Sequence, residues 1–319
     1  MENNINKMDI SKAKQLFFTF LLLAMAIHLQ AQQDSQYTQY MYNTQTINPA
    51  YVGSQDGFVV NSLYRNQWVG LEGAPETLNF SFNTPIGQNE RVGLGLSFFK
   101  DRIGPADESQ IALDISYNIP LDNGFKLAFG MKGGINLLNV DYSLLNIFNP
   151  SDPLQQFNID NRLTPVIGAG FLLTRNDTWY IGISVPNFLE TTHYDDTTVS
   201  NASERANLYL TGGYVFNLNN NLEFKPAVLG KFISGSPAAL DFSANFRFNR
   251  KFTLGAAYRL DASVSALAGF QVNDGIFIGY VYDYGIQELA NYNSGSHEIF
   301  LSFRLGKKSP SKIISPRFF

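Results

Sequence analysis

The stretch IALDISYNIPLDNGFKLAFG, residues 111–130, decides how the rest of the chain is interpreted. Apolar side chains occupy every second position from Ile111 to Ile119, and the same alternation resumes from Phe125 to Phe129. A period of two is typical of β-strands that have one apolar and one polar face. Because Pro120–Gly124 has the composition of a tight turn, the stretch predicts a β-hairpin. Its apolar faces could meet either the core of a soluble sandwich or lipid.

The composition restricts the class of protein. The 319 residues are 45% hydrophobic and only 16% charged, which is few charges for a soluble surface. A mean hydropathy of -0.10 argues against a helical membrane protein, which needs several apolar stretches of roughly 20 residues. The net charge of -4 gives no reason to expect nucleic acid as a partner. The chain has no cysteine, so disulfides and thiolate metal sites are excluded.

The N-terminal residues have the layout of an export signal. Lys7, Lys12 and Lys14 precede an apolar run over residues 16–27, and Ala31 follows in a polar stretch. This order predicts a secretory signal peptide that is cleaved after Ala31. A single membrane anchor is disfavoured because the run has only about a dozen residues.

Segments of alternating character repeat along the rest of the chain. There are about fourteen, an even number as in bacterial outer-membrane barrels, and most have about ten residues, enough for a tilted strand to cross a bilayer. They lie near residues 58–68, 75–85, 91–101, 108–120, 124–138, 162–175, 178–185, 205–217, 221–233, 238–249, 251–261, 263–273, 275–284 and 297–306.

The connections between these segments fall into two alternating sets. One set is short and rich in Asn, Asp, Gly and Pro, whereas the other holds the long connections 140–161, 186–204 and 285–296. Outer-membrane barrels have short periplasmic turns and longer outer loops, and a sandwich has no reason to sort its loops in this way. The sequence therefore predicts an all-β fold: a closed antiparallel transmembrane β-barrel of about 14 strands, after a cleaved signal peptide.

The expected organisation is a signal peptide at 1–31, a periplasmic or lumenal segment at 32–57, the outer-membrane barrel at 58–306 and a periplasmic tail at 307–319. The segment before the first strand is too polar to span lipid, and it could enter the lumen as a plug. Both chain ends are expected on the periplasmic side. Inward charges such as Lys132, Glu223 and Asp241 fit either a packed polar interior or a selective channel.

Little in the sequence points to chemistry. His193, beside Asp195 and Asp196, has no second histidine at ligand spacing, and no nucleophile–base arrangement is present. We therefore expect no enzyme activity, no catalytic or metal-ligating residue and no cofactor. Glycines within strands, namely Gly93, Gly95, Gly168 and Gly170, are interpreted as relieving crowding or curvature.

Aromatic residues suggest two further features. Trp68, Trp179 and Tyr180 lie near strand ends and are interpreted as parts of interfacial girdles. The long connections form a polar outer rim with aromatic points, a mixture that suits protein contact as well as it suits solvated loops. The candidate partner-binding residues on this rim are Phe148, Phe157, Phe188, Tyr194 and Tyr292.

Several stretches go beyond a generic barrel pattern: QYTQYMYNTQTINPAYVGS at 36–54, YRNQWVGLEGAPETLNFSFNTPI at 64–86 and GSHEIFLSFRLG at 295–306. With them, the sequence resembles the PorP/SprF family of the type IX secretion and gliding system over essentially the whole mature chain. The residues that carry the resemblance are Asn48, Pro49, Ala50, Tyr51, Gln67, Trp68, Gly70, Glu72, Gly73, Pro75, Gly295, Ser296, His297 and Glu298.

The resemblance implies a non-enzymatic protein of the outer membrane of a Gram-negative, Bacteroidetes-type bacterium. It implies support for the secretion or surface attachment of an exported protein with a type B C-terminal sorting domain, gliding adhesins being one example. The implied partners are outer-membrane lipid, that exported protein and the periplasmic lipoprotein ring of the secretion machine. The alternative function is a porin-like diffusion channel for small solutes. A barrel enzyme such as a lipase ranks third.

Overall fold

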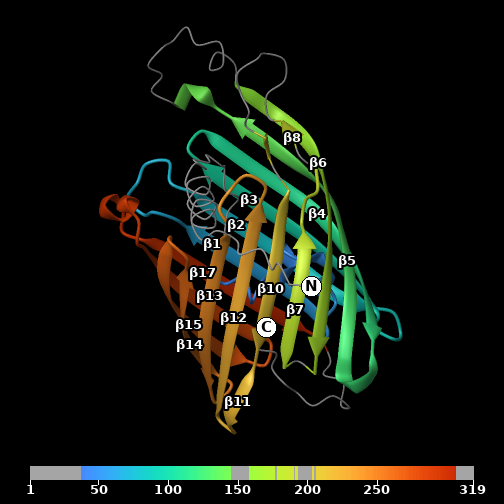
Figure 1. Cartoon of the computed structure of the whole chain (residues 1–319). Coiled ribbons are helices and arrows are strands. Elements are labelled where there is room, and N and C mark those ends of the chain that lie inside the picture. The colour runs from blue at the N-terminus through green and yellow to red at the C-terminus, as the bar shows by residue number, and fades with distance from the viewer. Residues whose placement is uncertain are drawn as a thin grey trace, which may run out of the picture.

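The chain forms a closed β-barrel in a computed structural model, which describes residues 37–144, 158–176, 178–189, 191–192, 203–204 and 206–306 (Figure 1). The barrel strands are β1 (Phe58–Asn66), β2 (Glu76–Ile86), β3 (Val92–Ile103), β4 (Ala106–Pro120), β5 (Phe125–Val140), β6 (Ile159–Arg175), β7 (Trp179–Val185), β10 (Asn207–Tyr214), β11 (Phe216–Asn219), β12 (Leu222–Ile233), β13 (Ala239–Phe248), β14 (Phe252–Arg259), β15 (Ser263–Asn273), β16 (Ile276–Gly285) and β17 (Ser296–Leu305).

Every strand pairs antiparallel with its neighbours around the wall. β10 and β11 both lie on β12 and are separated only by Val215, so these two segments fill one of fourteen wall positions. β1 pairs with β17, and β10 pairs with both β7 and β12, which closes the sheet. A two-stranded hairpin, β8 (Thr191–Thr192) with β9 (Ser203–Glu204), stands apart from the barrel. The predicted closed barrel of about 14 strands is confirmed.

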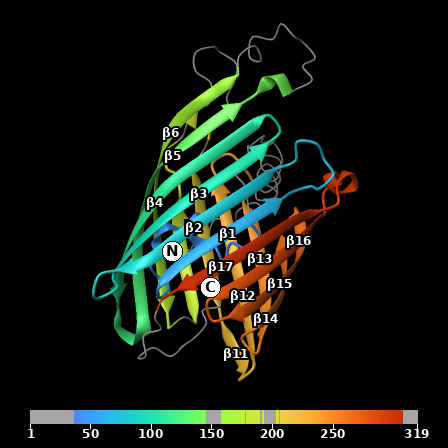
Figure 2. The same cartoon turned by 180° about the vertical axis from the view of Figure 1, so that it is seen from behind.

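The two ends of the barrel differ in the length of their connections. One end carries the connections 67–75, 141–158, 186–206 and 286–295, and we call it the long-loop end. The other, the short-turn end, carries turns such as 87–91, 121–124 and 249–251. Figure 2 shows the opposite side of the wall, where β1 and β17 lie next to each other. No helix among the described residues is both long and apolar enough to cross a membrane.

The alternation read in the opening hairpin separates two environments. Outward side chains such as Leu113 and Ile115 are exposed and apolar, whereas their neighbours Asp114 and Ser116 are buried inside the barrel. In the register, Asp114 lies opposite Lys132 and Leu113 lies opposite Gly133, so the two faces stay separate from strand to strand. The barrel interior holds the buried core.

The prediction that Tyr180 belongs to an interfacial girdle is wrong. Trp68 is exposed at the long-loop end, and Trp179 packs edge-on against Phe125, with ring centroids 5.7 Å apart. Tyr180, however, is buried in the lumen in one apolar cluster with Ala50, Tyr51 and Leu172. Because neighbouring residues of a strand face opposite sides, Trp179 and Tyr180 cannot both face lipid.

Candidate functional site: the occupied lumen and its latch

A short segment before β1 fills the lumen. Residues 37–53, which we call the plug, contain no charged residue, and nearly all of them are buried. Its conformation includes two short 3-10 turns, Thr44–Thr46 and Pro49–Tyr51, and the Asn48 side chain caps the second by accepting from the Ala50 N–H. The segment thus lies inside the barrel, which is one of the two places considered from the sequence.

The plug contacts the wall on opposite sides. On one side, amide side chains bond to β2, β4 and β6: Asn43 donates to Asn79 (2.7 Å), Gln45 to Asp114 (3.0 Å) and Asn48 to the Phe171 carbonyl (3.0 Å). On the other side, Tyr40, Met41 and Ile47 pack in an apolar cluster whose wall members come from β10, β12, β14, β15 and β16, namely Tyr209, Leu229, Ala257, Leu267 and Val281. The plug therefore spans the lumen from wall to wall.

Glycines of the wall make room for the plug. A Cβ atom at Gly130 would lie 2.1 Å from the Ala50 nitrogen, and one at Gly93 would lie 2.2 Å from the Val52 carbonyl oxygen. At Gly170 the obstacle is the Asn48 side chain, at 2.2 Å, and at Gly95 it is the Gln45 side chain, at 2.6 Å. The interpretation of Gly93, Gly95 and Gly170 as relief of crowding is confirmed, and the crowding comes from the plug.

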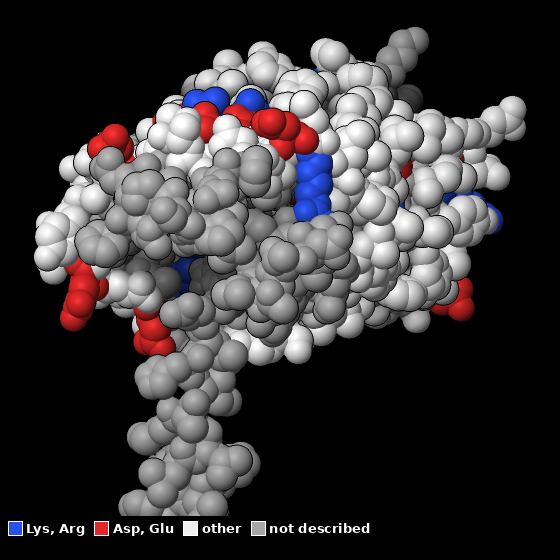
Figure 3. Space-filling view, turned by 90° about the horizontal axis from the view of Figure 1, so that it is seen from above, with Lys and Arg blue, Asp and Glu red and all other residues white. Residues whose placement is uncertain are grey.

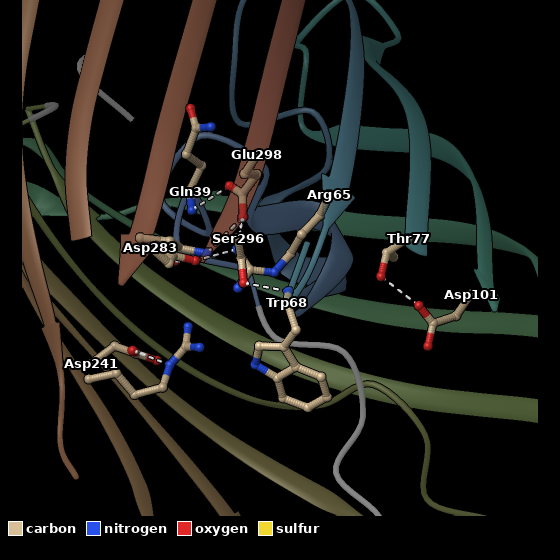
Figure 4. A network of polar contacts seen from close by, with 11 residues as sticks. Gln39, Arg65, Trp68, Thr77, Asp101, Asp241, Asp283, Ser296 and Glu298 are labelled. Carbon is tan, nitrogen blue, oxygen red and sulfur yellow. Dashed lines mark hydrogen bonds and ion pairs between the residues drawn. The ribbon is translucent and has the colours of Figure 1, made fainter. Parts of the chain in front are cut away.

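The first described part of the plug is held by three wall residues, which we call the latch: Arg65, Asp283 and Glu298 (Figure 4). The backbone N–H groups of Thr38 and Gln39 donate to the two carboxylate oxygens of Glu298, at 3.0 and 2.8 Å. The Thr38 hydroxyl donates to Asp283 at 3.0 Å. Arg65 Nη1 lies 2.5 Å from Asp283 and 3.0 Å from Glu298. One guanidinium thus compensates two buried carboxylates that accept from the plug.

The latch fixes the direction of the plug. Arg65 and Glu298 lie at the long-loop ends of β1 and β17, whereas Gly53 lies against Gly93 at the short-turn end. The plug therefore runs from the long-loop end towards the short-turn end, where it continues into β1. β17 ends at the short-turn side as expected, but the first described residues lie towards the opposite end. Residues 32–36 and 307–319 lie outside the described part of the chain.

The three sequence blocks of the family resemblance lie in two places. Asn48, Pro49, Ala50 and Tyr51 belong to the plug. The other two blocks meet at the long-loop end, where the Trp68 N–H donates to Ser296 Oγ (3.1 Å) and the Val69 N–H donates to the Gly295 carbonyl (2.9 Å).

Local bonds and backbone shape fold the connection 67–75. Its ends are joined by the Gln67 N–H, which donates to the Pro75 carbonyl at 2.9 Å. Gly70 and Gly73 have positive φ, and Glu72 is exposed. His297 faces outward, where Nδ1 lies 2.6 Å from the Tyr280 hydroxyl. Sequence reasoning missed Arg65 and Asp283, although the inward parity of Arg65 on β1 was a usable signal.

Three further pairs of lumenal charges join neighbouring strands of the wall. Lys132 lies 3.1 Å from Asp114, Arg259 lies 2.7 Å from Asp241, and Arg247 donates to Glu223 at 2.6 Å. Each pair joins residues that are directly opposite in the register. The interior is thus packed and polar, and these six charges compensate each other within the wall.

A cavity of about 400 Å³ lies beside the plug at the short-turn end. Tyr51, Gly53 and Asp56 line it from the plug side. The wall and its turns contribute Glu90, Lys126 and Leu172, among others.

The predicted rim residues are not brought together where they can be placed. Phe188 is 48% exposed beside β6, and Tyr292 is 73% exposed beside β16; six strands separate β6 and β16 in either direction around the barrel. Phe148, Phe157 and Tyr194 lie outside the described residues, as do His193, Asp195 and Asp196. In the view from the long-loop end, much of the described surface is uncharged and drawn white, and the charged side chains lie mainly towards the edge (Figure 3).

At the base of the connection 141–158, hydrogen bonds join its two ends. The Tyr142 N–H donates to Asn158 Oδ1 at 2.9 Å, and the Asn158 side chain donates to Asp141 at 3.0 Å. The Ser143 hydroxyl and N–H, together with Asn158, lower the pKa of the Asp141 carboxyl. This connection thus begins from a defined base.

Comparison with known proteins settles the family. The sequence profile of the type IX secretion system membrane protein PorP/SprF matches residues 29–303. The chain belongs to the PorP/SprF family. Membership and the closed barrel together indicate a protein of the outer membrane, in a family of secretion-system membrane proteins. None of the curated proteins gives a significant match.

Solved structures similar to this family member are barrels of low sequence identity. The toluene transporter TbuX of Ralstonia pickettii has a TM-score of 0.51 and 12% identity, with 81% of this chain and 92% of that chain covered. Omp33, an outer membrane protein of Acinetobacter baumannii, has a TM-score of 0.47 and 8% identity, with 79% and 100% covered. At 12% identity the likeness to TbuX shows the fold alone.

Proposed function

We propose that this PorP/SprF protein supports the secretion or surface attachment of an exported partner that carries a type B C-terminal sorting domain. Family membership and the outer-membrane barrel support this role. In this proposal the long-loop end faces the cell surface of a Bacteroidetes-type bacterium, the short-turn end and the tail 307–319 face the periplasm, and residues 1–31 are removed as a signal peptide. The lipoprotein ring of the secretion machine would then meet the short-turn end.

The observation that carries the proposal is the contrast between a filled lumen and a long-loop end that exposes aromatic side chains. The plug spans the barrel, which argues against a permanently open diffusion channel. At the long-loop end, Trp68, Leu289 and Tyr292 are exposed on two connections. Hydrogen bonds of Val69 with Ser294 and Gly295 hold these connections together. Rigidly presented aromatic side chains are typical anchors of protein interfaces. The rim therefore favours a protein partner, and no catalytic role is proposed.

The test is to shorten the connection between Val140 and Asn161 while keeping Asp141 and Asn158 at its base. We expect the barrel to insert at normal abundance and to stay heat-stable, while the partner that co-purifies with it is lost from the cell surface. Retention of that partner would remove this connection from the binding site. Large, steady single-channel steps from the unaltered protein would instead favour the porin-like alternative.

The orientation is tested separately with an epitope. Inserted near Ser151, it should be accessible to antibody on intact cells, whereas the same epitope near Asn220 should become accessible only after the outer membrane is broken. The reverse result would contradict the topology without changing the fold.

A further inference from the structure

The two ends of the plug are attached differently. The end that begins at Tyr37 is held by hydrogen bonds of Thr38 and Gln39 to Glu298 and Asp283. The other end continues through residues 54–57 into β1 at the short-turn end. Gly53 and Gly57 bracket this connection with φ values of +67° and +81°, a region that is accessible to glycine at little cost. The first described end of the plug is therefore held by hydrogen bonds that water can replace, whereas the other end is covalently continuous with β1.

Withdrawal of the plug would leave no ion pair broken. The plug carries no charge. The pairs Lys132–Asp114, Arg247–Glu223 and Arg259–Asp241 are formed between wall strands, and the latch carboxylates keep Arg65. Polar groups that now accept from the plug would be hydrated in an emptied lumen, so they would not be left as buried, unsatisfied atoms.

A cavity adjoins the tethered end of the plug. The cavity of about 400 Å³ is lined by Tyr51, Gly53, Ser54 and Asp56, which are the last residues of the plug and the first of its connection to β1. Because the tether and this cavity are both at the short-turn end, a released plug would move towards that end.

We propose that the plug is a hinged stopper and that the barrel has a second activity as a gated conduit for small hydrated ions and solutes. The latch of Arg65, Asp283 and Glu298 keeps the conduit closed. Release of Thr38 and Gln39 lets residues 37–53 turn about Gly53–Gly57 towards the short-turn end. The emptied lumen would be lined by the ion pairs of the wall and by Lys225 and Lys231, so that water and small hydrated solutes meet a polar surface.

The first test removes the latch carboxylate and compares it with a matched carboxylate. Glu298→Ala removes both acceptors of the plug N–H groups. Glu223→Ala instead removes a lumenal carboxylate whose ion-pair partners are Arg247 of β13 and Arg250 of the turn that follows. In planar bilayers with KCl, we expect the open fraction of Glu298→Ala to exceed that of the unaltered protein by at least about tenfold, because even one charge-assisted hydrogen bond shifts an equilibrium by roughly that factor. Glu223→Ala should remain closed.

A second test is independent of the latch. Deletion of residues 37–53 should give steady conductance in KCl, and should let vesicles that contain the barrel swell in small sugars. Insertion of each variant is checked by its heat-dependent gel mobility, so a closed variant can be distinguished from an unfolded one.

A third test locks the plug. The chain has no cysteine, and the Asn43 side chain lies 3.1 Å from Ser81 Oγ, so Asn43→Cys with Ser81→Cys offers a plug–wall crosslink. In the Glu298→Ala background, oxidation should abolish the openings and reductant should restore them. Two results would overturn the proposal. One is that Glu298→Ala inserts in the membrane but conducts no more than Glu223→Ala, and the other is that the deletion variant inserts but shows no conductance. Neither result would bear on the proposed function, because that is measured separately as retention of the exported partner at the cell surface.

Discussion

The lipid-facing and lumen-facing sides of the same strands follow opposite rules. Leu113 is 66% exposed on the outer surface, and the next residue, Asp114, is 1% exposed inside the barrel, paired with Lys132 and bonded to the plug. The outer face needs only apolar area, because lipid imposes no specific partner. The inner face must satisfy each buried charge and leave room for a second layer of chain. One alternating pattern therefore encodes an outer face that needs only apolar side chains and an inner face whose polar side chains need specific partners.

The largest expected effect comes from breaking an inner ion pair. Asp114→Ala leaves Lys132 buried without its carboxylate, and removing one partner of a buried pair costs about 3–5 kcal/mol. Urea unfolding of the barrel in lipid vesicles measures the loss. The control is Asp107→Ala, whose pair with Lys100 is partly exposed and is expected to contribute about 0–1 kcal/mol. Equal losses would break the comparison.

The next effect tests the outer face. Leu113→Arg or Phe246→Arg places a charge in lipid and should cost about 2–4 kcal/mol near the midplane of the bilayer. Leu121→Arg, in an exposed turn at the short-turn end, should cost about 0–1 kcal/mol. The same unfolding measurement serves, and a midplane arginine as harmless as the turn arginine would contradict the assignment of this face to lipid.

A matched pair of glycines on β5 gives a sharper comparison. In Gly130→Ala the new methyl group collides with the plug at Ala50, and overpacking of this kind costs about 1–3 kcal/mol. In Gly133→Ala the methyl group meets no atom within 4 Å, so the change should be neutral or stabilise by about 0.4–1 kcal/mol. If both variants unfold at the same urea concentration, the plug does not press on this part of the wall.

The smallest effect is expected at an inward position without a charge. Ser243 is buried, and its hydroxyl lies 3.5 Å from the Asn245 amide, which is a weak contact. Ser243→Ala should cost less than about 1 kcal/mol. A loss as large as that of Leu113→Arg would mean that the inner face depends on every polar group and not mainly on its ion pairs.

Much of the barrel could be predicted because the relevant signals are local. Alternation located the strands to within a few residues, and turn chemistry sorted the long connections to one end. The site could be predicted less well. The latch joins Thr38 to Glu298 across 260 positions of the sequence, and no local sequence pattern predicts a contact between residues so far apart.

The sequence by itself determined the strands, their two faces and the family. A period of two and the order of motifs can be read from local sequence, without knowing which distant residues are in contact. Only the tertiary structure decided that Tyr180 faces the lumen and that Gly130 yields space to Ala50. It also decided that residues 37–53 fill the barrel from the long-loop end, because the plug has no periodicity of its own and takes its conformation from a closed wall. The physical reason is the closure of the barrel. Residues that are distant in the sequence come into contact across the lumen only after the strands have formed a closed wall.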